Sequence, residues 1–204
     1  MRRMISFAMI SLLAAGLGSC GSARPVRYYT LQLPAAPGPS AAGVYPFTLL
    51  VGRIQAPEIL QEEPIVYRTG PNGIDTYPYH HWVEPPVQLV RDRLARCLRD
   101  SGKYRSVVQL GSSLQGDFVL RGKLYDFEEV DAERIETLVT MEFELVDPKT
   151  HTALWTHYYS HRDPVPGKTI PEVVTALDHN LEQGLSEISA GLDAYFSARL
   201  SPKR

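Results

Sequence analysis

The sequence predicts an α+β fold of two layers, a mostly antiparallel sheet with two main helices packed on one face. Two observations support this class. Segments in which hydrophobic and polar residues alternate, as in half-buried strands, recur along most of the chain. Two other segments carry hydrophobic residues at helical spacing, one near the middle of the chain and one at its end. The order strands, helix, strands, helix favours this arrangement, and 204 residues are enough to bury one core.

The first strands are expected before residue 80. Residues 27–31 form a short strand, and a second run alternates so that Phe47, Leu49 and Val51 share one side. The turn residues 70–73, Gly-Pro-Asn-Gly, then join two runs into a hairpin, because proline presets φ and asparagine and glycine tolerate left-handed geometry. The strands predicted here are residues 27–31, 47–54, 64–68 and 74–79.

The first helix is expected to begin at Pro85-Pro86, where a missing backbone N–H costs least, and to end at Gly102. Cys97 falls on its hydrophobic arc, which predicts a small buried packing residue and not a nucleophile. Leu89 is the one hydrophobic residue out of place on the opposite, charged side, which includes Arg93. The hydrophobic arc consists of Val87, Val90, Leu94, Cys97 and Leu98.

Four further strands follow this helix. In the second of them the hydrophobic side changes beyond Leu124, where Tyr125 and Phe127 take over, and this change predicts a bulge at Gly122. The third alternates most clearly, and its glutamates Glu136, Glu142 and Glu144 form the solvated side. The four strands are residues 104–110, 117–127, 135–145 and 153–161, the last two joined by a turn at 147–150.

The last helix has a capping signal at its start. Thr169 is the N-cap and Glu172 lies three residues later, the spacing of a capping box. Hydrophobic residues then recur at steps of three and four up to about Arg199. Gly184 and Gly191 lower the helix propensity slightly and allow close packing on the sheet.

The N-terminus has the features of a lipoprotein signal. Arg2 and Arg3 precede a charge-free stretch at residues 4–17, too short for a confident membrane span. Leu17-Gly18-Ser19-Cys20 then resembles the bacterial lipobox, which implies cleavage before Cys20 and a diacylglycerol and an N-acyl chain on that residue. An ordinary signal peptide cut elsewhere is the alternative. Gly21, where an aspartate would favour inner-membrane retention, favours the outer membrane, with the domain on its periplasmic face.

The chain divides into four parts on this basis. Residues 1–19 are the signal peptide, residues 20–46 a lipid-anchored tether, residues 47–200 one globular domain and residues 201–204 a tail. The tether includes a linker at 34–43 composed only of Pro, Ala, Gly and Ser. Loss of Arg2 and Arg3 changes the formal charge from −2 to −4. A nucleic-acid partner is therefore not favoured.

No residue pattern supports catalysis, a cofactor or a metal. The sequence has no nucleophile elbow, phosphate-binding loop or dinucleotide fingerprint. His151, His157 and His161 share one side of a strand region, but positions four apart lie about 13 Å from each other, too far to hold one ion. Only two cysteines are present, which excludes a disulfide-dense scaffold and a four-cysteine zinc site. We therefore expect no enzyme.

An aromatic cluster is the candidate partner contact. Large aromatic side chains with polar tips suit interfaces. The alternative for Trp82 is that it holds the first helix against the sheet, and this alternative is favoured. The candidate contact residues are Tyr67, Tyr77, Tyr79, Trp82 and Leu89.

Several of these features occur in the order of one known family. The lipobox is followed by Arg27-Tyr28-Tyr29-Thr30-Leu31, a strand ending near Pro57, and Trp82 shortly before Pro85-Pro86. The sequence thereby resembles the ABC-type transport auxiliary lipoprotein family, the PqiC-like proteins. The remaining segments that carry the resemblance are residues 65–68, 101–104, 107–108, 118–120 and 126–128 and the capped final helix.

The resemblance implies a non-enzymatic accessory of an MCE-type lipid transport system. Such a lipoprotein sits at the outer membrane and docks the MCE-domain protein that bridges the periplasm from an inner-membrane permease and ATPase. Because an MCE partner is ring-shaped, a homo-oligomeric ring of this chain is plausible. Cys20 is the one functional position that the family transfers. A scaffold subunit of another envelope assembly or secretion complex remains the alternative.

Overall fold

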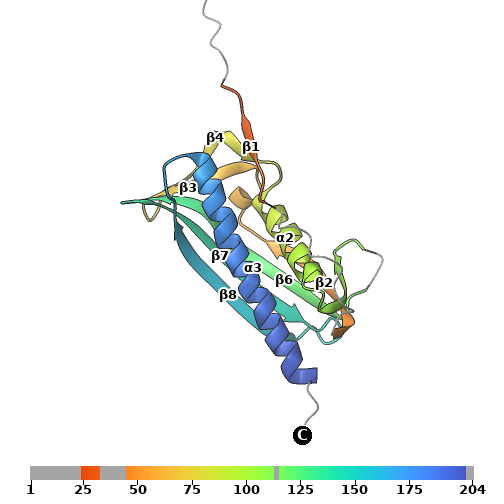
Figure 1. Cartoon of the computed structure of the whole chain (residues 1–204). Helices are drawn as coiled ribbons and strands as arrows, with labels where there is room; N and C mark the ends of the chain where they lie inside the picture. The colour runs from red at the N-terminus through yellow and green to blue at the C-terminus, as the bar shows by residue number, and fades with distance from the viewer. Residues whose placement is uncertain (1–23, 33–44, 113–114, 201–204) are drawn as a thin grey trace, which may run out of the picture.

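A computed structural model describes residues 24–32, 45–112 and 115–200. A curved sheet forms one layer, and two helices lie side by side across one of its faces (Figure 1). The predicted α+β class is therefore confirmed. The described elements are β1 (Arg27–Tyr29), β2 (Tyr45–Gln55), the 3₁₀ helix η2 (Glu58–Leu60), β3 (Pro64–Thr69), β4 (Ile74–Trp82), α2 (Pro86–Asp100), β5 (Tyr104–Gln109), β6 (Phe118–Asp131), β7 (Ile135–Val146), β8 (Ala153–Pro164) and α3 (Ile170–Leu200).

The long strand β6 organises the sheet. One edge of β6 pairs with β7 along nearly its whole length, and β7 pairs with β8. The other edge has two partners, because β2 pairs with the first half of β6 and β3 pairs with its last residues. A strand of 14 residues is about 45 Å long, which leaves room for both. The sheet therefore forks into a β2–β5 branch and a β3–β4–β1 branch.

Antiparallel pairing dominates by length. It joins β3 to β4 and β7 to β8, as the turns at 70–73 and 147–150 predict, and it also joins β6 to β7. Parallel pairing joins strands that are not consecutive in the chain: β2 with β5, β2 with β6, β3 with β6, and β1 with β4. Helix α2 provides one of these crossings, from β4 to β5.

The core lies between the sheet and the two helices. The predicted inward side of β2 is confirmed, since Leu49 and Val51 are fully buried and Phe47 is nearly so. The inward side predicted for β7 is also confirmed, and its glutamates are partly exposed on the opposite side, but Thr140, expected with them, is buried and bonded to Ser160. Each fully buried aliphatic side chain of this kind contributes about 1.5–3 kcal/mol to folding. The helix residues that complete the core include Val90, Leu94, Leu98, Leu177, Leu181, Leu185, Ile188 and Leu192.

Helix α2 buries a wider arc than its sequence pattern predicts. Leu89 and Arg93, both expected on the exposed side, are only 8% and 5% exposed. The reason is a second cover on α2: Leu31, just after β1, is 4% exposed and lines the same small hollow as Leu89 and Arg93. Cys97 is half-buried rather than fully buried, and burial raises the pKa of its thiol.

The bulge predicted at Gly122 lies at Tyr125, three residues further along. The register between β6 and β7 shifts between Leu124 and Asp126, and this shift moves Phe127 to the core side. Tyr125, expected with Phe127 on the hydrophobic side, is 40% exposed. Gly122 stays in register with Phe143, and a Cβ at Gly122 would meet the ring of Phe143 at 2.6 Å. This glycine is therefore required by close packing.

Helix α3 is placed as its sequence predicts. The backbone N–H and the hydroxyl of Thr169 both donate to the Glu172 carboxylate, at 2.9 and 2.7 Å, and these bonds lower the pKa of Glu172. Gly184 lies on Met141 and on the ring of Tyr159, and Gly191 lies on Trp155, so both glycines allow close packing. Across the described ranges, we find no helix with the length and hydropathy to span a bilayer.

Candidate functional site

The predicted lipidation site, Cys20, lies outside the described residues, as does the linker at 34–43. Arg24 is the first residue that the structure describes, and it precedes β1. Strand β1 is firmly held by the domain, because the Val83 N–H donates to the Tyr29 carbonyl at 2.8 Å. The tether therefore enters the fold through β1, at the edge of the sheet next to β4 (Figure 1).

Two of the five candidate contact residues, Trp82 and Leu89, are buried, contrary to a role in partner contact. Trp82 is fully buried and its ring lies 5.5 Å from the ring of Phe127. It holds the start of α2 against the sheet, as the alternative interpretation proposed. Leu89 is covered by the segment after β1, as described above. Neither side chain has a surface to offer a partner in this structure.

The three tyrosines lie on the β3–β4 hairpin. The rings of Tyr67 and Tyr77 lie 4.5 Å apart at a tilt of 37°, and the Tyr77 hydroxyl donates to Glu129 at 3.0 Å. Burial, followed by the Glu129 charge, raises the pKa of Tyr77. These two tyrosines are half-buried and tie the hairpin to β6, whereas Tyr79 is 40% exposed.

The described histidines do not meet at one site, although two of them share a partner. The rings of His80 and Tyr29 stack with their centroids 5.7 Å apart. Burial, together with the charge of Arg27, lowers the pKa of His80. His161 and His179 both contact Asp163, at 3.1 and 2.8 Å. No group of three or more His, Cys, Asp or Glu side chains with metal-binding geometry occurs within the part of the chain that the structure describes.

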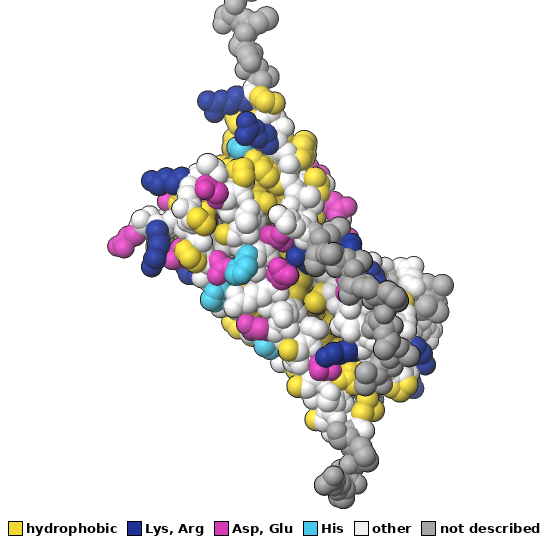
Figure 2. All heavy atoms as spheres, viewed as in Figure 1, with side chains coloured by type: hydrophobic (Ala, Val, Ile, Leu, Met, Phe, Trp, Pro, Cys, Tyr) yellow, Lys and Arg dark blue, Asp and Glu magenta, His cyan; other side chains and the backbone are white. Residues whose placement is uncertain are grey.

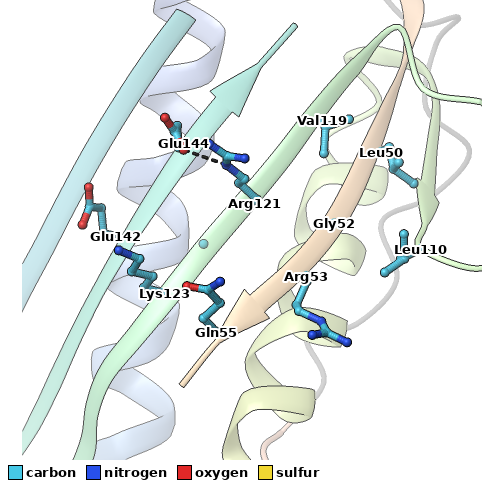
Figure 3. Close-up of a pocket in the computed structure, with 11 residues that line it drawn as sticks. Leu50, Gly52, Arg53, Gln55, Leu110, Val119, Arg121, Lys123, Glu142 and Glu144 are labelled. Atoms are coloured by element: carbon cyan, nitrogen blue, oxygen red, sulfur yellow. Dashed lines mark hydrogen bonds and ion pairs between the residues drawn. The ribbon is translucent and has the colours of Figure 1, made fainter. Parts of the chain in front are cut away.

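The face of the sheet opposite the helices contains a broad hollow of about 630 Å³ (Figure 3). Strands β2 and β6 form the floor of the hollow. Gly52 has no side chain to fill it, and a Cβ at this position would lie only 3.1 Å from Val119. Hydrophobic side chains line one end, and charged side chains from β6 and β7 line the other. The hydrophobic lining residues are Leu50, Leu110 and Val119.

Two basic side chains of this hollow have no acidic partner among the described residues. Arg121 points to Glu144, with Nε 2.7 Å from its carboxylate, and Glu142 accepts a hydrogen bond from Tyr125. Arg53 and Lys123 make no ion pair with any residue that the structure describes. They are therefore available to bind carboxylate or phosphate groups.

A second hollow of about 640 Å³ continues from the first towards the start of α2. Both hollows share Gly52, Arg53, Gln55 and Leu110, so they form one continuous groove. Four basic side chains and two acidic ones line the groove, although the whole chain has a net charge of −2. We refer to this as the basic groove. Its basic residues are Arg53, Arg91, Arg121 and Lys123.

The basic groove was not predicted from the sequence. Arg121 and Lys123 alternate with inward positions of β6, so their outward direction was readable from the sequence. That Arg53 lies near Arg121 and Lys123 was not readable from the sequence. Arg53 belongs to β2, and only the parallel pairing of β2 with β6 brings these residues together. Sequence patterns indicate which side of a strand is wet but not which strands are neighbours.

Comparisons with known proteins agree on one family and one fold. The sequence model of the ABC-type transport auxiliary lipoprotein component matches residues 29–189. The crystal structure of protein XCC0632 from Xanthomonas campestris is similar with a TM-score of 0.76 and 20% identity, covering 87% of this chain and 100% of that one. A crystal structure described as an uncharacterized protein has a TM-score of 0.65 and 17% identity, covering 83% and 99%. No curated protein sequence matches the chain.

Proposed function

This chain belongs to the ABC-type transport auxiliary lipoprotein family, and from that premise we propose that it is the non-enzymatic outer-membrane accessory of an MCE-type lipid transport system. The family match over residues 29–189 is the observation that carries the proposal. In this role the chain docks the far end of an MCE-domain protein that bridges the periplasm. The permease and ATPase of the system stand at the inner membrane.

The anchor of this accessory is Cys20. The lipobox at residues 17–20 supports acylation of its thiol and its new amino group. Two or three acyl chains hold a protein stably on a bilayer, where one chain would be marginal. Gly21, in place of an aspartate, supports the outer membrane as the destination.

The basic groove is the proposed docking surface for the MCE partner. It is open, and its Arg53 and Lys123 have no acidic partner among the described residues. Its hydrophobic end, with Leu50 and Val119, provides contact area next to these charges. We propose that an acidic, partly hydrophobic segment of the partner binds here, since opposite charge speeds association and selects register. A homo-oligomeric ring of this chain, matched to the ring of the partner, is part of the same proposal.

Co-purification tests the docking. The lipidated chain is tagged, isolated from membranes of its host, and the recovered MCE-domain protein is quantified against the bait. We expect the double variant Arg53→Glu/Lys123→Glu to recover several-fold less partner, because both free cations become repulsive. The matched control is Lys149→Glu/Lys168→Glu, which makes the same change of charge at exposed positions outside the groove.

The outcomes separate the parts of the proposal. Equal recovery with both double variants overturns the groove as the docking surface while leaving the MCE partnership intact. Recovery of a secretion or assembly complex in place of MCE, permease and ATPase components overturns the proposed system and favours the scaffold alternative. A native mass measurement of the Cys20→Ser chain that shows only monomer, with and without the partner, overturns the ring.

A further inference from the structure

Exposed hydrophobic side chains gather where the tether enters the domain. Among the described residues, nine large hydrophobic side chains are exposed, and four of them lie within or beside the stretch where β1 pairs with the end of β4. Figure 2 shows hydrophobic side chains with basic ones beside them at this end, below the N-terminal trace. We call these four the entry patch: Val26, Tyr28, Tyr79 and Val83, exposed by 41, 60, 40 and 48%.

The entry patch is one continuous and rigid surface. Tyr28 pairs with His81 across the parallel ladder, and their rings meet edge to face at 5.8 Å. The patch cannot swing free, because Tyr29 bonds His80 at 2.9 Å and the Gln32 N–H donates to Asp178 on α3 at 3.0 Å. The orientation of the entry patch therefore fixes the orientation of the whole domain.

The charges around the entry patch are basic on the tether side. Arg24 and Arg27 are exposed and make no ion pair within the described ranges. Residues 20–31 contain no acidic side chain. On the β4 side, the exposed Glu84 directly follows Val83. Tyrosine rings flanked by arginines suit the boundary between headgroups and acyl chains of an anionic bilayer.

The length of the tether decides what the patch meets. Only residues 21–23 separate Cys20 from Arg24, so these two residues lie at most about 14 Å apart in any conformation. By the same count Val26 lies at most about 22 Å and Tyr28 at most about 29 Å from Cys20. Once Cys20 carries its acyl chains, the tether keeps Val26 and Tyr28 within these distances of the lipid surface, so this end of the domain is the one held next to the membrane.

We infer that the entry patch is a second membrane contact, which rests on the lipid leaflet that holds the Cys20 anchor. This inference depends on the acylation in the proposed function and goes beyond it. It gives the domain a fixed orientation, with the β1–β4 end on the membrane. The last turn of α3, at the opposite end of the molecule in Figure 1, then points away from the bilayer. A helix of 31 residues is about 46 Å long. In this orientation α3 therefore extends the domain by up to about that distance from the membrane surface.

Hydroxyl-radical footprinting of the full lipidated chain tests this inference. The protein is reconstituted on vesicles of phosphatidylethanolamine and phosphatidylglycerol and compared with the lipid-free Cys20→Ser chain. Tyr28 and Tyr158 are matched reporters, exposed by 60 and 61% on different parts of the surface. On vesicles we expect the oxidation rate of Tyr28 to fall towards that of buried Tyr104, which is 7% exposed, while Tyr158 keeps its rate.

A variant pair sharpens the result. Tyr28→Ser/Val83→Ser removes half of the entry patch, so Tyr79 is expected to regain its lipid-free reactivity on vesicles. Tyr158→Ser removes an equally exposed ring elsewhere and is expected to leave Tyr79 protected.

The inference is overturned if Tyr28 and Tyr158 react equally on vesicles of acylated protein. It is also overturned if Tyr28 becomes protected in the lipid-free chain as protein concentration rises, since a second copy then covers the patch. The mass of the N-terminal peptide reports acylation separately. An unacylated Cys20 overturns the proposed anchor and this inference together, whereas acylated protein with a reactive Tyr28 overturns this inference alone.

Discussion

Arg93 of α2 and Asp178 of α3 face each other between the two helices, with Nη1 of the arginine 3.3 Å from Oδ1 of the aspartate. The side chains are only 5 and 13% exposed. The second carboxylate oxygen of Asp178 accepts the backbone N–H of Gln32. One carboxylate thus joins both helices to the segment that leads to the predicted anchor.

This contact predicts an asymmetric response to mutation. Arg93→Leu leaves Asp178 buried without its counter-charge and is expected to lower the free energy of unfolding by about 3 kcal/mol, whereas Arg93→Leu/Asp178→Leu is expected to lose less. Urea denaturation of the wild type and the variants measures this. A double variant less stable than the single one would contradict the expectation.

The pH dependence of the Arg93→Leu variant follows from the same contact. Burial already raises the pKa of Asp178, while the Gln32 bond and Arg93 oppose that rise. Without Arg93 the folded-state pKa increases further above the unfolded value, so the protonated carboxyl favours folding and ionisation disfavours it. The stability deficit of the variant should therefore be smaller at low pH and grow as pH rises through the folded pKa. Denaturation curves from pH 4 to 8, as differences from wild type, check the sign.

Gly184 tests the fit between α3 and the sheet. A Cβ there would lie 2.8 Å from the ring of Tyr159, which is itself buried and bonded to Asn180. Gly184→Ala is expected to destabilise the chain by about 1–3 kcal/mol despite its better helix propensity, because the core is overpacked. Ser186→Ala, at an exposed position of the same helix, is the control and is expected to change stability by less than about 0.5 kcal/mol. Equal effects would contradict close packing.

Asp163 links β8 to α3 through a histidine. Its hydrogen bond and charge raise the pKa of His179. A raised histidine pKa contributes stability that is present below the unfolded value, about 6.5, and is lost as pH rises through the folded value. The pKa of His179, followed by NMR, should therefore fall in Asp163→Asn, and the small stability difference between wild type and variant should vanish at alkaline pH. An unchanged His179 titration would refute the linkage.

Cys20→Ser tests the predicted anchor. Without the thiol there is no acceptor for diacylglycerol, so the variant is expected in the soluble periplasmic fraction, while the wild type sediments with the outer membrane. Membrane fractionation with quantitative blotting measures the distribution. Cys97→Ser, a change at a half-buried thiol in α2, serves as the matched control and should stay with the membrane. Persistent outer-membrane association of Cys20→Ser would refute anchoring by acylation.

The sequence alone determined the local order of this protein. The alternation of β7, the capping residues of α3 and the prolines before α2 act through neighbours in the chain, so their periodicity and spacing are visible without tertiary structure. The succession of motifs also sufficed to identify the family. The predicted lipobox is also a local pattern, and its residues lie outside the part of the chain that the structure describes.

Tertiary structure alone decided which elements meet. The burial of Leu89 and Arg93 depends on the segment at Leu31, which lies far from α2 in the chain. The basic groove depends on β2 pairing in parallel with β6, and the entry patch depends on β1 pairing with β4. A one-dimensional pattern specifies which side of a strand or helix seeks the core, but partner strands and helix covers are chosen by packing over the whole domain.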